Sequence, residues 1–233
     1  IIDTNTHVIT GVEGLVRWMP EGREPVPTET LIQIAEESGL IIQLGEWVIN
    51  EACRQFRDWQ GIRINPPRIA INISTEQFKR VDVAELVAAS LKKHNLEARH
   101  LEIEITEGAM MADESRTLLA LEKLRAMGVS ISLDDFGTGF SSLSYVNRFP
   151  IDTLKVDRSF ISCVEYEKGS RAIATAVIAL AHQLNLKVVG EGVENSAQEK
   201  FLFDNDCHEM QGYFYSKPLS PEELSSILVR GKL

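Results

Sequence analysis

The sequence predicts an α/β fold in which a mostly parallel sheet closes into a barrel. Short β-rich runs alternate with amphipathic helical segments from the first tryptophan to the end of the chain, which is the sequence form of repeated βα units. The length of 233 residues is ordinary for one α/β barrel and needs no second domain. We therefore expect residues 1–233 to form a single domain.

Strands are expected where β-branched and apolar runs stand between turn residues. The first candidate, Val8 to Trp18, leaves an alternative open, because Ile1 to Trp18 could be one strand or a hairpin that turns at Asp3 to Thr6. A hairpin would make the opening of the barrel antiparallel. The other strands are expected at Arg68 to Ile73, Leu101 to Thr106, Ser130 to Asp134, Thr153 to Val156, Lys187 to Glu191 and Glu209 to Gly212.

Helices are expected in the segments between these strands. Pro27 and Thr28 provide a start signal for the first helix and Gly39 a stop, while Pro221 begins the last one. The predicted helices are Thr28 to Ser38, Gly45 to Trp59, Val83 to His94, Asp113 to Met127, Ser170 to Leu184, Ser196 to Phe203 and Glu222 to Val229.

Composition and charge limit the classes of partner and substrate that the chain can have. Apolar residues make up 44% of the chain and charged residues 25%, which is typical of a globular domain. The formal net charge of −10 repels phosphate-rich polymers, so no duplex nucleic acid is expected as a partner. An anionic substrate would need local cations, and bound metal ions are the simplest source of them.

Cysteine usage and hydropathy indicate the compartment. Cys53, Cys163 and Cys207 are odd in number and far apart, which fits neither a disulfide framework nor a CxxC site. The cytoplasm is therefore expected. No stretch is long enough to be a membrane segment, although a full-length protein could be anchored elsewhere. The start at Ile1, without Met, suggests a domain excised from a longer regulatory protein.

Two adjacent carboxylates, Asp134 and Asp135, follow the apolar run Val129 to Leu133 and precede the turn Phe136 to Gly139. Neighbours in a regular strand point to opposite faces, so both reach one site only if the strand ends there. Crowded carboxylates repel unless cations lie between them, and two metals about 3.5 to 4 Å apart are a standard arrangement in phosphoester hydrolysis. Taken alone, the pair is explained equally well as a cap of the turn or of the next helix.

A second acidic group interrupts the apolar strand Leu101 to Thr106. With a period of two, Glu102, Glu104 and Thr106 share one face, and the last two lie nearest the carboxyl end, where barrel enzymes act. A carboxylate in such a run needs a partner to offset its desolvation. For Glu102, which lies deeper, an outer-face ion pair with a helix Lys or Arg is an equal alternative.

Other polar residues stand at strand ends. The amide oxygen of Asn72 suits Mg²⁺ or Mn²⁺, although an ordinary turn role is also compatible. Lys155 could orient or deprotonate a water, or form a structural ion pair with Asp157 or Glu102.

Glu191 and Glu194, on either side of Gly192 and Val193, could instead be helix-entry carboxylates. The five histidines include no HExxH pair, which disfavours a His-based zinc site. The most specific interpretation that the residues allow is a metal site with oxygen ligands.

These motifs resemble the EAL family of cyclic di-GMP phosphodiesterases over nearly the whole chain, from Gly11 to Leu219. The matching segments are Glu13-Gly14-Leu15-Val16-Arg17-Trp18, Ala70 to Ser74, Glu104 to Glu107, Asp134 to Leu143, Asp152 to Phe160, Gly190 to Glu194 and Gln211 to Tyr213.

The resemblance implies a modified TIM (β/α)8 barrel with one antiparallel strand. It implies hydrolysis of one phosphodiester of cyclic di-GMP to linear pGpG, with two Mg²⁺ or Mn²⁺ ions per site activating a water. It also implies a homodimer with the Asp134 to Leu143 loop near the interface, and regulatory domains in the full-length protein. A catalytically silent cyclic di-GMP receptor or a dimerisation module of the same fold is the alternative.

The resemblance also implies roles for individual residues. Lys155 is similar to the lysine that holds or activates the attacking water, Glu107 to the residue that steadies the loop after Asp135, and Glu191 to a catalytic carboxylate that completes the metal shell directly or through water. The other implied metal ligands are Glu13, Asn72, Glu104, Asp134 and Asp135, and the implied substrate contacts are Leu15, Arg17, Asp157, Glu194 and Gln211.

Three positions depart from the family pattern. Gly14 stands where the family's name has Ala, Phe140 where Tyr is common, and Gly190 where Ala is common. None removes an implied ligand. Gly14 adds backbone freedom beside Glu13, and the missing hydroxyl at Phe140 could alter the coupling of the loop.

Overall fold

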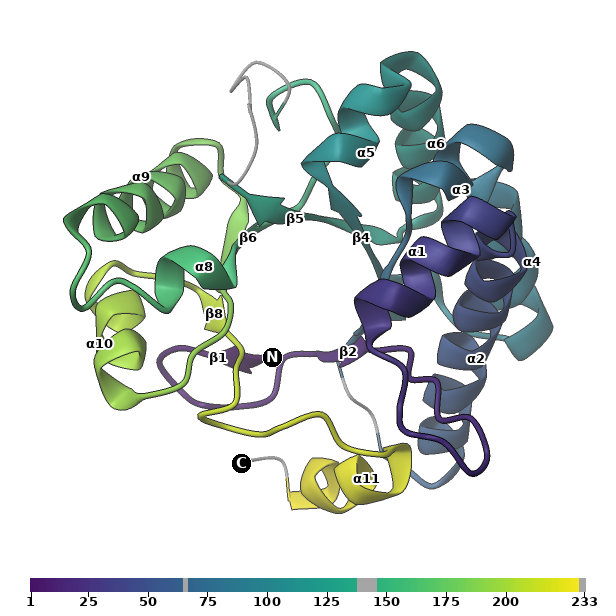
Figure 1. Cartoon of the computed structure of the whole chain (residues 1–233), viewed down its shortest axis with the longest axis horizontal. Helices are drawn as coiled ribbons and strands as arrows, with labels where there is room; N and C mark the ends of the chain where they lie inside the picture. Colours follow the sequence, from purple (N-terminus) through teal and green to yellow (C-terminus); the bar gives the residue numbers. More distant parts are fainter. Residues whose placement is uncertain (65–66, 138–145, 231–233) are drawn as a thin grey trace.

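The computed structural model describes residues 1–64, 67–137 and 146–230, and its eight strands curl into a barrel-like ring with the helices outside (Figure 1). The strand order is β1-β8-β7-β6-β5-β4-β3-β2, and only the β1–β8 pair is antiparallel. The predicted modified barrel with one antiparallel strand is therefore confirmed. The strands are β1 Ile2–Asp3, β2 Val12–Gly14, β3 Ile69–Asn72, β4 Leu101–Thr106, β5 Ser130–Phe136, β6 Thr153–Val156, β7 Lys187–Gly190 and β8 Glu209–Met210.

The start of the chain is a tight turn, as the hairpin alternative predicted. Asp3 accepts a hydrogen bond at Oδ1 from the backbone N of Thr6, at 2.7 Å, and Ile2 and Ile9 form an antiparallel bridge. The expected strand Val8 to Trp18 is wrong, because only β2 within it joins the sheet. The remaining strand boundaries differ from the expected ones by at most two residues.

Within the described residues, the helices follow the predicted pattern, with three short additional α-helices. Helix α2 begins four residues before the expected Gly45, because it starts at Leu40 and Ile41 without a side-chain cap that a sequence could reveal. Helices α3, α5 and α8 were not predicted, since they are too short to show a helical period. The helices are α1 Thr28–Ser38, α2 Ile41–Gly61, α3 Thr75–Arg80, α4 Val83–His94, α5 Glu107–Ala112, α6 Glu114–Met127, α8 Arg158–Ile161, α9 Lys168–Gln183, α10 Ser196–Asp204 and α11 Pro221–Arg230.

Apolar side chains fill the space between the sheet and the helices, whereas the inside of the ring carries charge. In β4, Ile103 and Ile105 belong to the hydrophobic core, and the alternate residues Glu102 and Glu104 are buried as well. Among the described ranges, no helix is long and apolar enough to cross a membrane.

A buried arginine connects segments that lie toward the two ends of the strand order. Arg68 lies just before β3, and its Nε is 2.5 Å from Glu102 on β4, while its Nη2 is 2.5 Å from Glu209 on β8. Its Nη1 also donates to the backbone oxygen of Thr10, which precedes β2, at 3.0 Å. The outer-face alternative for Glu102 is thus wrong, because its partner is an arginine of the neighbouring strand segment. The pairing helps to close the ring between the edge strands β1 and β2, where Ile2 of β1 forms an isolated bridge with Ile9, which precedes β2.

Replacing Arg68 by Met should destabilise the fold by about 3 to 5 kcal/mol, because two buried carboxylates lose their partner. Arg54→Met is the matched control, since Arg54 pairs with Glu51 on the exposed face of α2 and should cost at most about 1 kcal/mol. Urea unfolding followed by circular dichroism measures both. Equal costs for the two variants would contradict the closing role of Arg68.

Candidate metal and phosphodiester site

The centre of the site is Lys155 on β6, whose side chain is 1% exposed. Its Nζ lies 2.8 Å from Glu104 Oε1, 2.7 Å from Glu191 Oε1 and 3.4 Å from Asp134 Oδ1. These partners come from β4, the end of β7 and β5, so the carboxyl ends of successive strands supply them. The alternative ion pairs of Lys155 with Asp157 or Glu102 are wrong, since its carboxylate partners are others.

The charges of this cluster shift one another's ionisation. Burial alone would lower the pKa of Lys155, but Glu191, Glu104, Glu13 and Asp134 together raise that pKa well above its usual value. Burial raises the pKa of Glu104 well above the ordinary range, against the opposing charge of Lys155. It likewise raises the pKa of Glu191 to about 8. Lys155 therefore carries its charge at neutral pH, whereas its partners Glu104 and Glu191 tend to hold protons.

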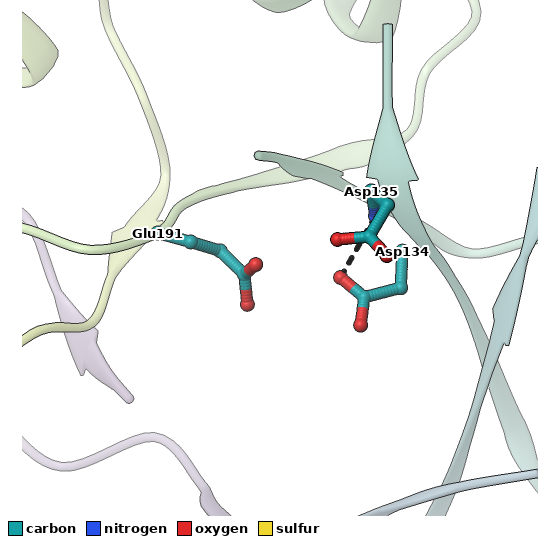
Figure 2. Close-up of side chains that lie close together, drawn as sticks. All are labelled: Asp134, Asp135 and Glu191. Atoms are coloured by element: carbon teal, nitrogen blue, oxygen red, sulfur yellow. Dashed lines mark hydrogen bonds between the residues drawn. The ribbon is translucent and has the colours of Figure 1, made fainter. Parts of the chain in front are cut away.

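A β-bulge brings the two adjacent aspartates to one side. The register between β5 and β6 shifts between Leu133 and Phe136, and Asp135 takes the left-handed conformation with φ 54°. The strand continues past Asp134, so the expected strand end there is wrong, yet the bulge has the same effect. One oxygen from each of Asp134, Asp135 and Glu191 lies within 4.8 Å of the others, and Figure 2 shows Glu191 facing the aspartate pair.

Two amide side chains connect the remaining carboxylates. Asn72 Nδ2 donates to Glu13 Oε1 at 2.9 Å and to Glu104 Oε2 at 3.1 Å. Gln211 Nε2 donates to Glu13 Oε2 at 3.0 Å and to Glu191 Oε1 at 2.6 Å. With the charge of Lys155, these bonds outweigh the effect of burial and lower the pKa of Glu13. The network keeps the carboxylates of Glu13, Glu104 and Glu191 directed at one place.

This donor set fits small divalent cations. It consists of carboxylate oxygens and one amide, with neither thiolate nor imidazole, and such oxygen-rich sets suit Mg²⁺ and Mn²⁺. The residues that could hold such ions are those named from the sequence: Glu13, Asn72, Glu104, Asp134, Asp135 and Glu191.

A cavity of about 870 Å³ opens beside this cluster. Glu13, Asp134, Glu191 and Gln211 line it together with the implied substrate contacts Leu15, Arg17 and Glu194. Its volume lies in the range of small-molecule sites. The structure thus brings most of the predicted site residues to one cavity.

Two of the predicted site residues, Asp157 and Glu107, accept hydrogen bonds from nearby backbone N–H groups. Asp157 caps α8, with Oδ1 accepting from Ser159 N at 3.0 Å. Burial, the charge of Asp134 and the charge of Asp157 together raise the pKa of Asp135 to about 6. Glu107 begins α5 and accepts a hydrogen bond at Oε1 from Gly137 N at 2.9 Å, which is where the loop after Asp135 starts. Phe140 and the rest of that loop, 138–145, lie outside the described residues.

The sequence interpretation missed the backbone contact between the segments that follow β7 and β8. Val193 N donates to Gln211 O at 3.0 Å, and Phe214 N donates to Val193 O at 2.9 Å. A Cβ on Gly212 would come within 2.1 Å of Val193 O, so only glycine permits this approach. This contact holds Gln211 opposite Glu191. Gly212, directly after the candidate site residue Gln211, was the signal in the sequence for such a close backbone approach.

The comparisons with known proteins agree with this site. A family model described as the EAL domain matches residues 1–218. The chain belongs to the EAL domain family. It is 44% identical over 214 residues to the bifunctional diguanylate cyclase/cyclic di-GMP phosphodiesterase MucR of Pseudomonas aeruginosa, covering 92% of this chain and 31% of that protein. It is 43% identical over 224 residues to the signaling protein YkoW of Bacillus subtilis, covering 95% and 28%.

A solved structure described as the PaMucR phosphodiesterase in complex with c-di-GMP is similar throughout. It shares 42% identity with this EAL domain at a TM-score of 0.91, covering 96% of this chain and 90% of that one. The domain spans about a third of the length of the curated relatives it matches. The predicted family is therefore confirmed.

Two of the three departures from the family pattern, Gly14 and Gly190, lie in the described residues, and their surroundings differ. A Cβ on Gly14 would make ordinary contacts, 3.4 Å from Ile71 Cγ2. A Cβ on Gly190 would overlap Leu202 Cδ1 at 2.4 Å, and Leu202 is fully buried. Gly190 is thus matched to a large neighbour on α10, whereas Gly14 has room for the usual alanine.

Gly14→Ala should raise the free energy of unfolding by about 0.4 to 1 kcal/mol, because alanine reduces the freedom of the unfolded chain. Gly190→Ala should lower it by about 1 to 3 kcal/mol through overpacking. Denaturant unfolding measures both changes, and adding Leu202→Ala should remove the clash but leave a cavity elsewhere. A stabilising Gly190→Ala would show that the contact with Leu202 is not limiting.

Divalent cations should stabilise the EAL domain, since they would bind the crowded carboxylates around Lys155 in place of protons. We expect Mg²⁺ or Mn²⁺ to raise Tm relative to EDTA, and to raise it more in Lys155→Met, where the cluster has lost its own cation. Asp134→Asn should reduce the shift. Thermal unfolding with Ca²⁺-free buffer, EDTA and each ion gives the measurement, and a Tm indifferent to both ions would argue against a metal site.

Proposed function

We propose that this EAL domain hydrolyses one phosphodiester of cyclic di-GMP to give linear pGpG. The observation that carries the proposal is the convergence of Glu13, Glu104, Asp134 and Glu191 on Lys155 beside a cavity. The relative MucR, whose name includes cyclic di-GMP phosphodiesterase, supports the choice of substrate. Two divalent cations, when bound, would polarise the phosphodiester and lower the pKa of the attacking water.

The residues of the chain would prepare the site before substrate arrives. Lys155, charged and buried, holds Glu104 and Glu191 in place, so that little reorganisation is needed when cations bind. Asn72 and Gln211 restrain Glu13 from both sides. Since the donor bonds of Asn72 use its nitrogen, its oxygen is the atom that could bind a cation.

The remaining predicted residues would serve the substrate and the loop. Arg17 lines the cavity, where its charge could bind a phosphate, and its Nη1 donates to Val16 O at 2.8 Å and to Thr28 Oγ1 at 3.2 Å. Leu15 offers an apolar surface beside it. Glu107, bonded to Gly137, would hold the loop after the aspartate pair in position.

We also propose the setting of the reaction. The domain would work as a homodimer in the cytoplasm, as the catalytic part of a longer protein whose other domains regulate it. The share of each relative that the chain covers supports a multidomain parent.

The test is chromatography of cyclic di-GMP incubated with the purified domain and Mg²⁺ or Mn²⁺. We expect linear pGpG to form, EDTA to stop its formation, and Asp134→Ala or Glu13→Ala to slow it by at least about 100-fold. Asp58→Ala, on the exposed face of α2, is the control and should be silent. Turnover that persists in either site variant would remove the assigned roles, and binding without product would indicate a receptor instead.

A further inference from the structure

His208 joins three strands near the amino ends of β7 and β8, away from the candidate site. It directly precedes β8, and its Nδ1 accepts a hydrogen bond from the backbone N of Val188 on β7, at 3.2 Å. Its backbone O accepts another from the N of Thr4, just after β1, at 3.1 Å. The ring and the backbone of one residue therefore hold β8 between its two neighbours in the sheet.

The bond to Val188 matters because the strand pairing at this place is short. β8 has two residues, and the pairs Val189 with Glu209 and Gly190 with Met210 join it to β7. The ring of His208 extends this pairing by one residue toward the amino ends. Val188 is fully buried, so water cannot easily replace the ring nitrogen as its acceptor. Loss of the acceptor would leave a buried N–H donor unpaired, which destabilises a fold.

This bond fixes the protonation state of His208. A ring nitrogen that accepts from a backbone N–H carries no proton, so Nδ1 is unprotonated and the neutral ring has its proton on Nε2. A protonated histidine has two donors and no acceptor. Protonation of His208 and its hydrogen bond to Val188 therefore exclude each other.

The groups around His208 oppose its protonation on balance. The ring of His182, at the end of α9, has its centre 4.8 Å away, and its Nε2 donates to the backbone O of Asp206 at 3.1 Å. Lys187 on β7 adds positive charge nearby, whereas Asp206 and Glu209 add negative charge. Burial, together with His182, lowers the pKa of His208 below its ordinary value of 6.5.

We propose that His208 is a pH-sensitive switch in the fold: uptake of a proton breaks its bond to Val188 and loosens β8 from β7. The inference goes beyond the proposed function and does not depend on it. The same two strands lead to Glu191 and Gln211, whose side chains are joined at 2.6 Å. A looser junction at the amino ends would weaken the support of that contact at the carboxyl ends.

The direction of the effect follows from the lowered pKa of His208. As the pH falls, the unfolded chain, whose histidine keeps the ordinary value of 6.5, takes up the proton before the folded chain does. The contribution of His208 to stability is therefore complete above that value. It is lost as the pH falls through the lower pKa of the folded state.

The test compares wild-type protein with His208→Asn, in buffers that contain EDTA so that metal binding does not enter the comparison. The Oδ1 of asparagine can accept the N–H of Val188 but does not titrate. His94→Asn is the control, because the ring of His94 contacts Asn50 on α2 instead. Thermal unfolding is measured at about pH 7.5 and about pH 5.5, on either side of the ordinary histidine pKa. In wild-type protein, NMR follows the ring nitrogens of His208 and the exchange of the Val188 amide.

Between the two pH values, the Tm of the wild type should fall by roughly 2 to 4 °C more than that of His208→Asn. His94→Asn should retain the larger fall. At the higher pH, NMR should show His208 with its proton on Nε2, and acid should protonate this ring and speed the exchange of the Val188 amide together. An equal fall of Tm in wild type and His208→Asn, or a proton on Nδ1 at the higher pH, would overturn the inference. If His208→Asn is unstable at both pH values, the NMR titration of the wild type decides, and protonation of His208 without faster Val188 exchange would refute the switch.

Discussion

The site depends on one buried ammonium group surrounded by carboxylates. Lys155 is within 4 Å of four carboxylates from β2, β4, β5 and the end of β7. Without a cation among them, groups held this closely in the interior would repel and take up protons. Because one lysine cannot balance four carboxylates, the pKa values of Glu104 and Glu191 stay raised even beside it, and these groups tend to hold protons. A divalent cation bound among the carboxylates would take the place of those protons, which is the physical reason for proposing a metal site at the mouth of the barrel.

The interior of the ring is organised in two charged layers. Arg68 with Glu102 and Glu209 forms the deeper layer, and Lys155 with Glu104 and its neighbours forms the layer at the carboxyl ends. Glu102 and Glu104 connect them as alternate residues of β4. The deeper layer joins β4 and β8, which lie toward opposite ends of the strand order, so it supports the geometry on which the upper layer depends.

Close backbone approaches determine the shape of the cavity. The Gly212 contact with Val193 fixes the loops after β7 and β8 together, and the open Cα of Gly192 makes room for Arg158. The bulge at Asp135 turns a second carboxylate toward the first. Such approaches need particular backbone angles and little side-chain volume. They shape the cavity wall beside the candidate metal-binding residues Asp134 and Glu191.

The sequence by itself determined the alternation of strands and helices, because hydrophobic periodicity and caps such as Gly39 act locally. It also indicated the polar residues at the strand ends, since a carboxylate such as Glu104 in an apolar run needs a partner. Only the tertiary structure decided which partner each one has. The pairing of Arg68 with Glu102, the choice of Lys155 as common partner and the bulge at Asp135 depend on register and ring closure. Those are contacts between residues tens to more than a hundred positions apart, which no local pattern encodes.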